Sequence, residues 1–162
     1  MDIKQRAWRG EQEIATNKTN DKKCRIMKVP KRFLVVDDDR TNNLICEFAL
    51  RRFSSNVDIK TFLDPQAALQ YITYSYNDEA PETPTVVFLD INMPVLSGWD
   101  FLAIFKNFPV ALQQQFVIYM LTSSIDERDL ERAELHPLVK ASLRKPLSTK
   151  TINEIFGIEA KL

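Results

Sequence analysis

Residues 33–41 read FLVVDDDRT, in which four apolar residues run directly into three aspartates. A short run that is apolar throughout is typical of a strand buried on both faces of a parallel sheet. Neighbouring carboxylates repel one another and hold water, so three of them at the end of a buried strand indicate a bound cation, a reaction or a coincidence. Asp39 on its own needs none of these, because it could cap the helix that starts near Thr41.

The same alternation of strand and helix continues along the chain. Further strands are expected at VDIKTF (57–62), TVVFL (85–89), FVIYML (116–121) and 140–143. Helical patterns occur at 41–53, after Asp64-Pro65, from Ser97-Gly98, over 126–135 and from Ser148. Apolar strands separated by helices predict an α/β fold, a doubly wound five-stranded parallel sheet with helices on both faces. Ligands of such a sheet gather at the carboxyl ends of its strands.

The composition is that of an ordinary globular protein. The chain has 162 residues, which suit one domain, with 44% hydrophobic and 27% charged residues. The formal net charge is zero, which gives no general reason to expect nucleic acid or an anionic membrane as partner. Residues 1–30 nevertheless hold eight Lys or Arg against four Asp or Glu. We therefore expect a flexible basic extension over 1–30, with Met27 as the suggested start, and a single domain over 31–162.

Cysteine usage and the lack of a targeting pattern favour the cytoplasm. Cys24 and Cys46 are the only cysteines, and they suggest neither a disulfide framework nor a metal-binding pair. The first 30 residues lack the apolar core of a signal peptide, and no run approaches the length of a membrane span.

Polar residues follow four of the expected strands. Asp37–Asp39 follow the first strand, Asp90 the third, Thr122 the fourth and Lys145 the fifth. Each has an ordinary explanation alone, as a helix cap, a turn acid or a surface lysine. Together they suit phosphoryl transfer, in which carboxylates hold a hard cation, one carboxylate is the nucleophile, and a lysine and a hydroxyl hold phosphoryl oxygens.

Four motifs, VVDDD, LDINMPVLSGWDFL, MLTSS and KPL, resemble the receiver domain of two-component response regulators over roughly residues 31–158. The likeness is greatest to stand-alone bacterial receivers such as the chemotaxis regulator. It implies a flavodoxin-like sheet with the strand order 2-1-3-4-5. It also implies a signalling domain rather than an enzyme, with intrinsic self-phosphorylation and autodephosphorylation chemistry.

The resemblance assigns a role to each of these side chains. Asp90 corresponds to the phospho-acceptor. Asp38 and Asp90 correspond to direct ligands of Mg²⁺, Asp37 to a ligand acting through water, and the backbone carbonyl of Asn92 to the remaining protein ligand. This leaves Asp39 as a helix cap or a solvent-facing residue.

The other two roles concern the phosphoryl oxygens. By the same resemblance, Thr122 is the hydroxyl that moves toward the phosphoryl group and Lys145 is the cation that pairs with it. A cis peptide is implied at Lys145–Pro146. Asn92 and Ser124 match positions that adjust how fast the acyl phosphate hydrolyses.

One position departs from the family pattern. Ser142 stands where most receivers have a tyrosine or phenylalanine whose inward swing reports phosphorylation. The usual aromatic switch is therefore in doubt, and we expect the signal to pass through the helix at 126–135, which has few apolar residues to anchor it.

The partners are expected to be proteins. His136, the only histidine, precedes Pro137, which argues against a phospho-accepting histidine in a helix. The donor is therefore expected to be a sensor histidine kinase or a histidine phosphotransfer protein. Seventeen residues follow Lys145, so we expect a downstream protein to read a changed surface on the last two helices and the strand between them.

Two alternatives remain open. VVDDDRT also fits haloacid-dehalogenase-like phosphatases, with Asp37 as nucleophile and Asp39 as acid/base. In that case Asp90 has no role, and only Glu154 and Glu159 follow Lys145 to complete a cation site. The second alternative is a pseudo-receiver, a binding module that keeps the fold without phosphorylation.

Overall fold

Five parallel strands form the centre of the fold, in the order β2-β1-β3-β4-β5. The computed structural model describes residues 29–76, 81–123 and 126–156. The strands are β1 (Arg32–Val36), β2 (Asp58–Phe62), β3 (Thr85–Asp90), β4 (Phe116–Thr122) and β5 (Val139–Arg144). The predicted α/β class and the implied strand order are both confirmed.

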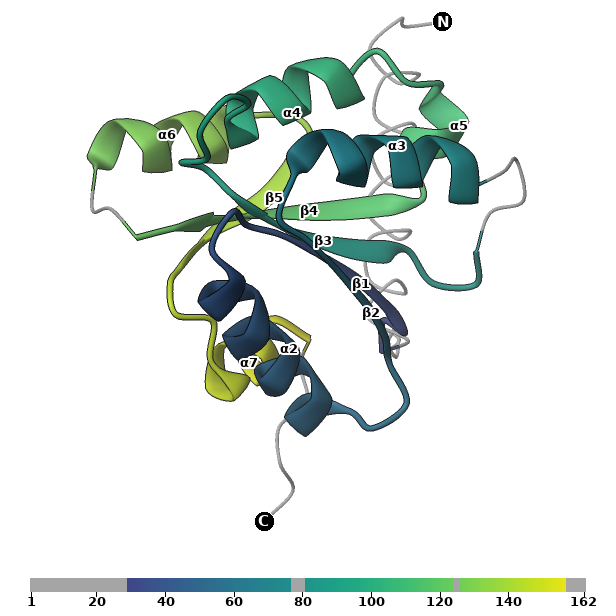
Figure 1. Ribbon diagram of the computed structural model, residues 1–162, viewed down its shortest axis with the longest axis vertical. Helices are drawn as coiled ribbons and strands as arrows, with labels where there is room; N and C mark the ends of the chain where they lie inside the picture. Colours follow the sequence, from purple (N-terminus) through teal and green to yellow (C-terminus); the bar gives the residue numbers. More distant parts are fainter. Residues whose placement is uncertain (1–28, 77–80, 124–125, 157–162) are drawn as a thin grey trace, which may run out of the picture.

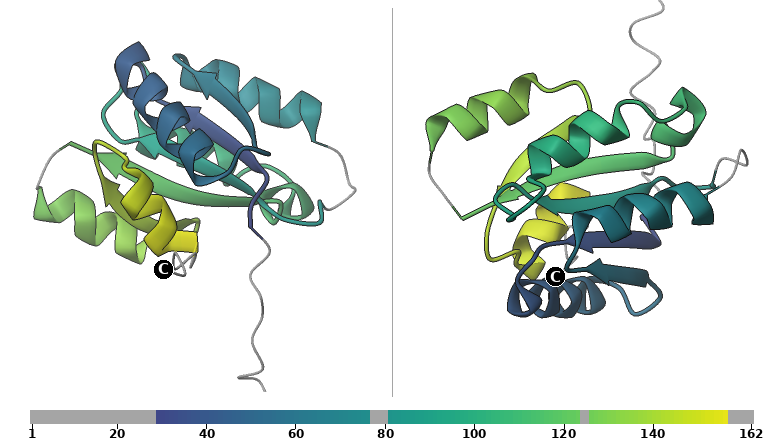
Figure 2. Two further views of the ribbon diagram at one scale, coloured as in Figure 1. Left: turned by 90° about the horizontal axis from the view of Figure 1, so that it is seen from below. Right: turned by 45° about the horizontal axis from the view of Figure 1, so that its top comes forward.

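Helices cover both faces of the sheet (Figures 1 and 2). One face carries α2 (Arg40–Phe53) and α7 (Thr149–Phe156), and the other carries α3 (Pro65–Ser75), α4 (Gly98–Phe105) and α6 (Glu127–Leu135). A four-residue helix, α5 (Val110–Gln113), lies between α4 and β4. The sequence analysis missed α5, because one helical turn is too short to show a periodic apolar pattern.

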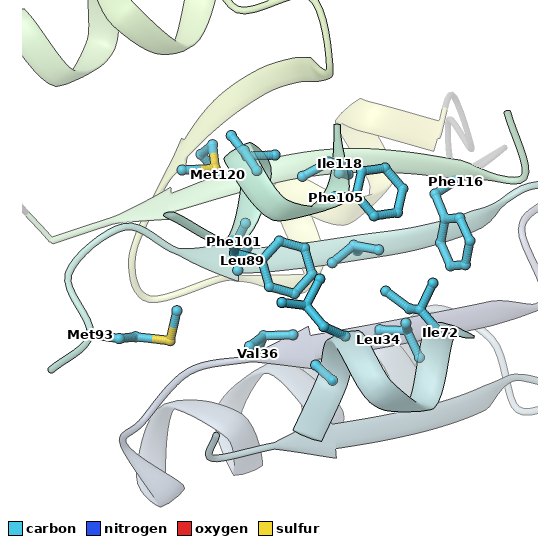
Figure 3. Close-up of a cluster of buried hydrophobic side chains, with 14 of the residues drawn as sticks. Leu34, Val36, Ile72, Leu89, Met93, Phe101, Phe105, Phe116, Ile118 and Met120 are labelled. Carbon is cyan, nitrogen blue, oxygen red and sulfur yellow. The ribbon is translucent and has the colours of Figure 1, made fainter. Parts of the chain in front are cut away.

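Each face of the sheet has its own apolar core, which explains why the central strands are apolar throughout. In β1, Leu34 and Val36 pack toward α3 and α4, whereas Phe33 and Val35 pack toward α2 and α7. All six residues of β3 are buried. Figure 3 shows the first core, where side chains from β1, α3, β3, α4 and β4 meet.

Local sequence signals set the helix ends. Asp39 caps α2 by accepting a hydrogen bond from the Thr41 backbone, as one reading of its role predicted. Asp64 caps α3 in the same way, with Pro65 in the first turn. Ser97 and Asp100 form a reciprocal capping box at the start of α4.

Several expectations concern residues outside the described ranges. These are the basic extension up to residue 28, including Met27, and Ser124 after β4. Among the residues that are described, no helix is long and apolar enough to cross a membrane.

Candidate functional site

Parallel pairing brings the acidic residues together at the carboxyl edge of the sheet. Val36 of β1 pairs with Leu89 of β3, so the residues that follow them, Asp37 and Asp90, lie at the same level. Asp37, Asp38 and Asp90 each offer one carboxylate oxygen, and these three oxygens lie within 4.8 Å of one another. Asp37 and Asp90 are buried, whereas Asp38 is exposed.

Lys145 joins the two buried carboxylates. Its Nζ lies 2.6 Å from Asp37 Oδ2 and 2.9 Å from Asp90 Oδ1, and its side chain is only 13% exposed. The residue follows β5, and its backbone N–H donates to the carbonyl of Thr122. The peptide between Lys145 and Pro146 is cis, as the resemblance implied.

Asp37 is held by its backbone as well as its side chain. Its Oδ1 accepts a hydrogen bond from the Asp39 backbone at 2.8 Å and a longer contact of 3.4 Å from Asn42 Nδ2. Its own N–H donates to the carbonyl of Phe62, the last residue of β2. A fully buried carboxylate needs such partners, because an unpaired charge in the interior is strongly unfavourable.

Burial and pairing shift the pKa values of this cluster. Burial raises the pKa of the Asp90 carboxyl; the hydrogen bond from Lys145 opposes this shift, and the charge of Asp37 adds to it. Burial alone would lower the pKa of Lys145, but its hydrogen bonds to Asp37 and Asp90 outweigh that effect and raise it. Lys145 is therefore an ammonium at neutral pH.

Of the remaining predicted residues, Thr122 and Asn92 lie at or just after the ends of strands at this edge of the sheet, and Ser142 does not. Thr122 is the last residue of β4 and is buried, one residue beyond Leu121, which pairs with Asp90. Asn92 is exposed in the loop after β3, and its backbone N–H lies 3.4 Å from Asp90 Oδ1. Ser142 pairs with Met120 in the middle of β5, away from the strand end.

Two backbone features near the start of α4 were not expected from the sequence. A Cβ on Gly98 would lie 2.4 Å from the carbonyl oxygen of Asp90, so only glycine lets α4 start this close to β3. Val95 has φ +69°, a left-handed conformation that is unusual for a β-branched residue, and its side chain is fully exposed. Strain of this kind is often found at functional sites.

The donor set suits a hard divalent cation. Three carboxylates converge, and within the described ranges one ammonium, that of Lys145, is in contact with the two buried ones. A cluster with more carboxylates than cations is stabilised by an additional positive charge. Carboxylate and carbonyl oxygens are the ligands that Mg²⁺ prefers. Asp37, Asp38 and Asp90 could therefore hold Mg²⁺.

Comparison with known proteins agrees with the fold. The model of the response regulator receiver domain matches residues 33–156. The chain is 26% identical to the response regulator Rcp1 of Synechocystis sp. over 132 residues, which cover 81% of this chain and 88% of that protein.

Solved structures give the same result. A response regulator receiver protein from Dyadobacter fermentans is 28% identical with a TM-score of 0.68, covering 76% of this chain and 93% of that one. A two-component response regulator from Cytophaga hutchinsonii is 26% identical with a TM-score of 0.67, covering 78% and 93%. The chain belongs to the response regulator receiver domain family of two-component systems.

Proposed function

We propose that this receiver domain accepts a phosphoryl group on Asp90 in a Mg²⁺-dependent reaction. The observation that carries the proposal is the convergence of Asp90 with Asp37, Asp38 and Lys145 at one edge of the sheet. The receiver domain then acts as a phospho-accepting signalling unit of a response regulator rather than as an enzyme with a separate substrate. Family membership favours this function over the haloacid-dehalogenase-like alternative, and the exposed Asp39 is already used as a helix cap.

In this mechanism a carboxylate oxygen of Asp90 forms a bond to phosphorus while the bond between phosphorus and the donor nitrogen breaks. Asp37, Asp38, Asp90 and the carbonyl of Asn92 would hold Mg²⁺, which neutralises charge on the phosphoryl oxygens when bound. Lys145 already contacts Asp90, so its ammonium is placed to pair with an oxygen of the new phosphoryl group. We assign the hydroxyl of Thr122, at the neighbouring strand end, to another of these oxygens.

The donor in this proposal is another protein, a sensor histidine kinase or a histidine phosphotransfer protein. His136 of this chain is the C-cap residue that follows α6, and its Nδ1 accepts a hydrogen bond from the Leu138 backbone N–H. Burial lowers the pKa of His136, and the charges of Arg132 and Lys106 lower it further. A neutral, backbone-bonded imidazole at a helix end supports a structural role for this residue.

The donor has to cover the edge of the sheet where Asp90 lies. α2 starts at this edge and carries the exposed apolar side chains Leu44, Ile45 and Phe48. Exposed apolar groups that lie together on a soluble domain often mark a protein contact. We therefore assign the donor contact to these three residues, named here the α2 apolar surface.

In this proposal a downstream protein reads a surface formed by α6, β5 and α7. The element that moves on phosphorylation is α6. Only Ala133 of α6 is buried, which supports a weakly anchored helix. Arg132 of α6 stacks on Trp99 of α4, with its guanidinium carbon 4.1 Å from the ring centroid. This contact links α6 to the helix that starts beside Asp90, a route that does not need an aromatic residue at Ser142.

Labelling with acetyl phosphate and Mg²⁺ tests the phospho-acceptor directly. Asp90→Ala is expected to abolish labelling, because it removes the nucleophile, and Asp37→Ala to weaken it, because it removes one cation contact. Mass spectrometry of the intact chain after borohydride trapping reads the result. Loss in Asp37→Ala with labelling retained in Asp90→Ala would support the phosphatase alternative. A folded wild-type chain that binds neither phosphoryl group nor beryllofluoride would be a pseudo-receiver.

The proposal also covers the bounds of the domain and the compartment of the protein. The receiver domain is assigned to residues 31–162, after a basic extension over 1–30, and the protein to the cytoplasm. Phosphotransfer profiling against the histidine kinases of the host would identify the donor.

A further inference from the structure

The amide of Asn43 joins the carboxyl ends of two strands at the acidic cluster. Asn43 lies in the first turn of α2, and its side chain is buried, with only 5% of the residue exposed. Its Nδ2 donates to the backbone carbonyl of Asp37 at 2.9 Å and to that of Phe62 at 3.2 Å. The sequence analysis assigned no role to this residue.

This amide replaces a missing step of the β-ladder. The strand β2 ends at Phe62, and the chain then turns toward the cap of α3 at Asp64. The Asp37 N–H still reaches the Phe62 carbonyl at 3.1 Å, but the carbonyl of Asp37 lies beyond the last residue pair of β1 and β2. Asn43 supplies a donor to that buried carbonyl and a second donor to the partly buried carbonyl of Phe62.

The two acceptors also fix the orientation of the amide. Two carbonyl oxygens require the NH₂ group of Asn43, and a flipped amide would set its own oxygen against them. In this orientation no donor among the described residues reaches the buried Oδ1. An unpaired buried acceptor is unfavourable, and an apolar side chain would avoid it. The gain from the two donated hydrogen bonds must outweigh this cost.

We propose that Asn43 is a positioning residue for the cation site. By fixing the peptide of Asp37, it holds the Asp37 carboxylate where that group meets Lys145 at 2.6 Å and lies within reach of Asp38 and Asp90. Asn43 does not itself bind the cation. The inference rests on the proposed function, because it requires that Asp37, Asp38 and Asp90 bind Mg²⁺.

Calorimetric titration of the full chain with Mg²⁺ tests this role. Asn43→Leu keeps the same branched arrangement of heavy atoms and removes both donors, and we expect its Mg²⁺ dissociation constant to rise roughly tenfold, as for other groups that orient metal ligands. Asn43→Ser, which retains one shorter donor, is expected to weaken binding as well and serves if the leucine variant does not fold. In acetyl phosphate labelling, the Mg²⁺ concentration for half-maximal rate is expected to rise while the maximal rate changes less.

The control is Ile72→Ala, a cavity variant in the core on the opposite face of the sheet. It lowers the free energy of unfolding without touching the acidic cluster, and its Mg²⁺ affinity is expected to stay within twofold of wild type. Unchanged affinity in both Asn43 variants, or equal weakening in Ile72→Ala, would overturn the positioning role. Absence of Mg²⁺ binding by the wild-type chain would instead overturn the proposed function.

Discussion

At the scale of single residues, the acidic cluster depends on Lys145. The ammonium contacts one oxygen of Asp37 and one of Asp90, and both carboxylates are almost completely buried. A buried ion pair can contribute little to stability as a whole, yet removal of one partner is costly because the other charge stays buried and unpaired. The contribution of Lys145 to stability therefore depends on the protonation state of Asp90, whose pKa is raised by burial.

Lys145→Met is expected to lower the free energy of unfolding by about 3 kcal/mol at pH 7 in the presence of a chelator. The raised pKa of Lys145 means that its stabilisation is present below its unfolded pKa and lost as pH rises through the higher folded value. In the variant, Asp90, whose pKa is already raised by burial, loses its counter-ion, so stability falls as this carboxyl ionises with rising pH. The difference between variant and wild type should therefore shrink toward pH 4 and again at strongly alkaline pH.

Urea titration at several pH values measures this difference. Lys150→Met is the matched control, because Lys150 is exposed and makes only a distant contact of 3.9 Å with Glu154. A constant difference from pH 4 to pH 9 would contradict the expected dependence on the Asp90 carboxyl.

The type of each residue and its position after an expected strand were enough to select Asp37, Asp38, Asp90, Thr122 and Lys145 as site candidates. It was not enough to find Asn43 or the requirement for Gly98. The role of Asn43 depends on where β2 ends, and the requirement for glycine at position 98 depends on how closely α4 approaches the carbonyl of Asp90. Both depend on distances between separate segments of the chain, which a local sequence pattern does not contain.

At the scale of elements, α6 differs from the other long helices. It buries only Ala133, whereas α2, α3 and α4 each bury four residues. The stacking of Arg132 on Trp99 is a side-chain contact that joins α6 to α4. The low apolar content of 126–135 made this weak anchoring predictable from the sequence, but the Trp99 contact was not.

Beryllofluoride with Mg²⁺ is expected to increase backbone hydrogen exchange in residues 127–135, because a change at Asp90 is passed through α4 to this weakly held helix. Arg132→Ala is expected to raise exchange there before any ligand is added and to reduce the further increase. Mass spectrometry of peptic fragments measures both effects.

Arg128→Ala provides the control for the same helix. Arg128 is largely exposed and pairs with Asp126 at the start of its own helix rather than with α4. Exchange that does not change across α6 on adding beryllofluoride to a chain that binds it would contradict α6 as the mobile element.

At the scale of the whole molecule, the two faces of the sheet are covered by different helices. α2 carries the α2 apolar surface at the edge where Asp90 lies, and α3 lies on the opposite face (Figure 1). The shared direction of the parallel strands places Asp37, Asp38, Asp90, Thr122 and Lys145 at this one edge. That arrangement followed from the sequence, because parallel strands share the direction of their carboxyl ends.

Phe48→Ala is expected to slow phosphotransfer from a protein donor roughly tenfold, since loss of one central apolar contact commonly costs more than 1 kcal/mol in binding. Labelling by acetyl phosphate should be unchanged, because a small donor needs no contact with α2. Time courses with the phosphorylated kinase found by profiling measure the first rate.

Tyr74→Ala is a suitable control, because Tyr74 is 85% exposed but belongs to α3. It should leave both rates unchanged. If Phe48→Ala slowed acetyl phosphate labelling equally, the effect would come from a distorted acidic cluster, and the α2 apolar surface would not be the donor contact.

The direction of β1 has a practical consequence for experiments on this protein. The described part of the chain enters the sheet at Val29 and Pro30, ahead of Arg32, while the carboxylates follow Val36 at the other end of the same strand. A strand of five residues is roughly 17 Å long. A fluorophore or an immobilisation handle placed just before β1 therefore starts at the far side of the molecule and leaves the approach to Asp90 open.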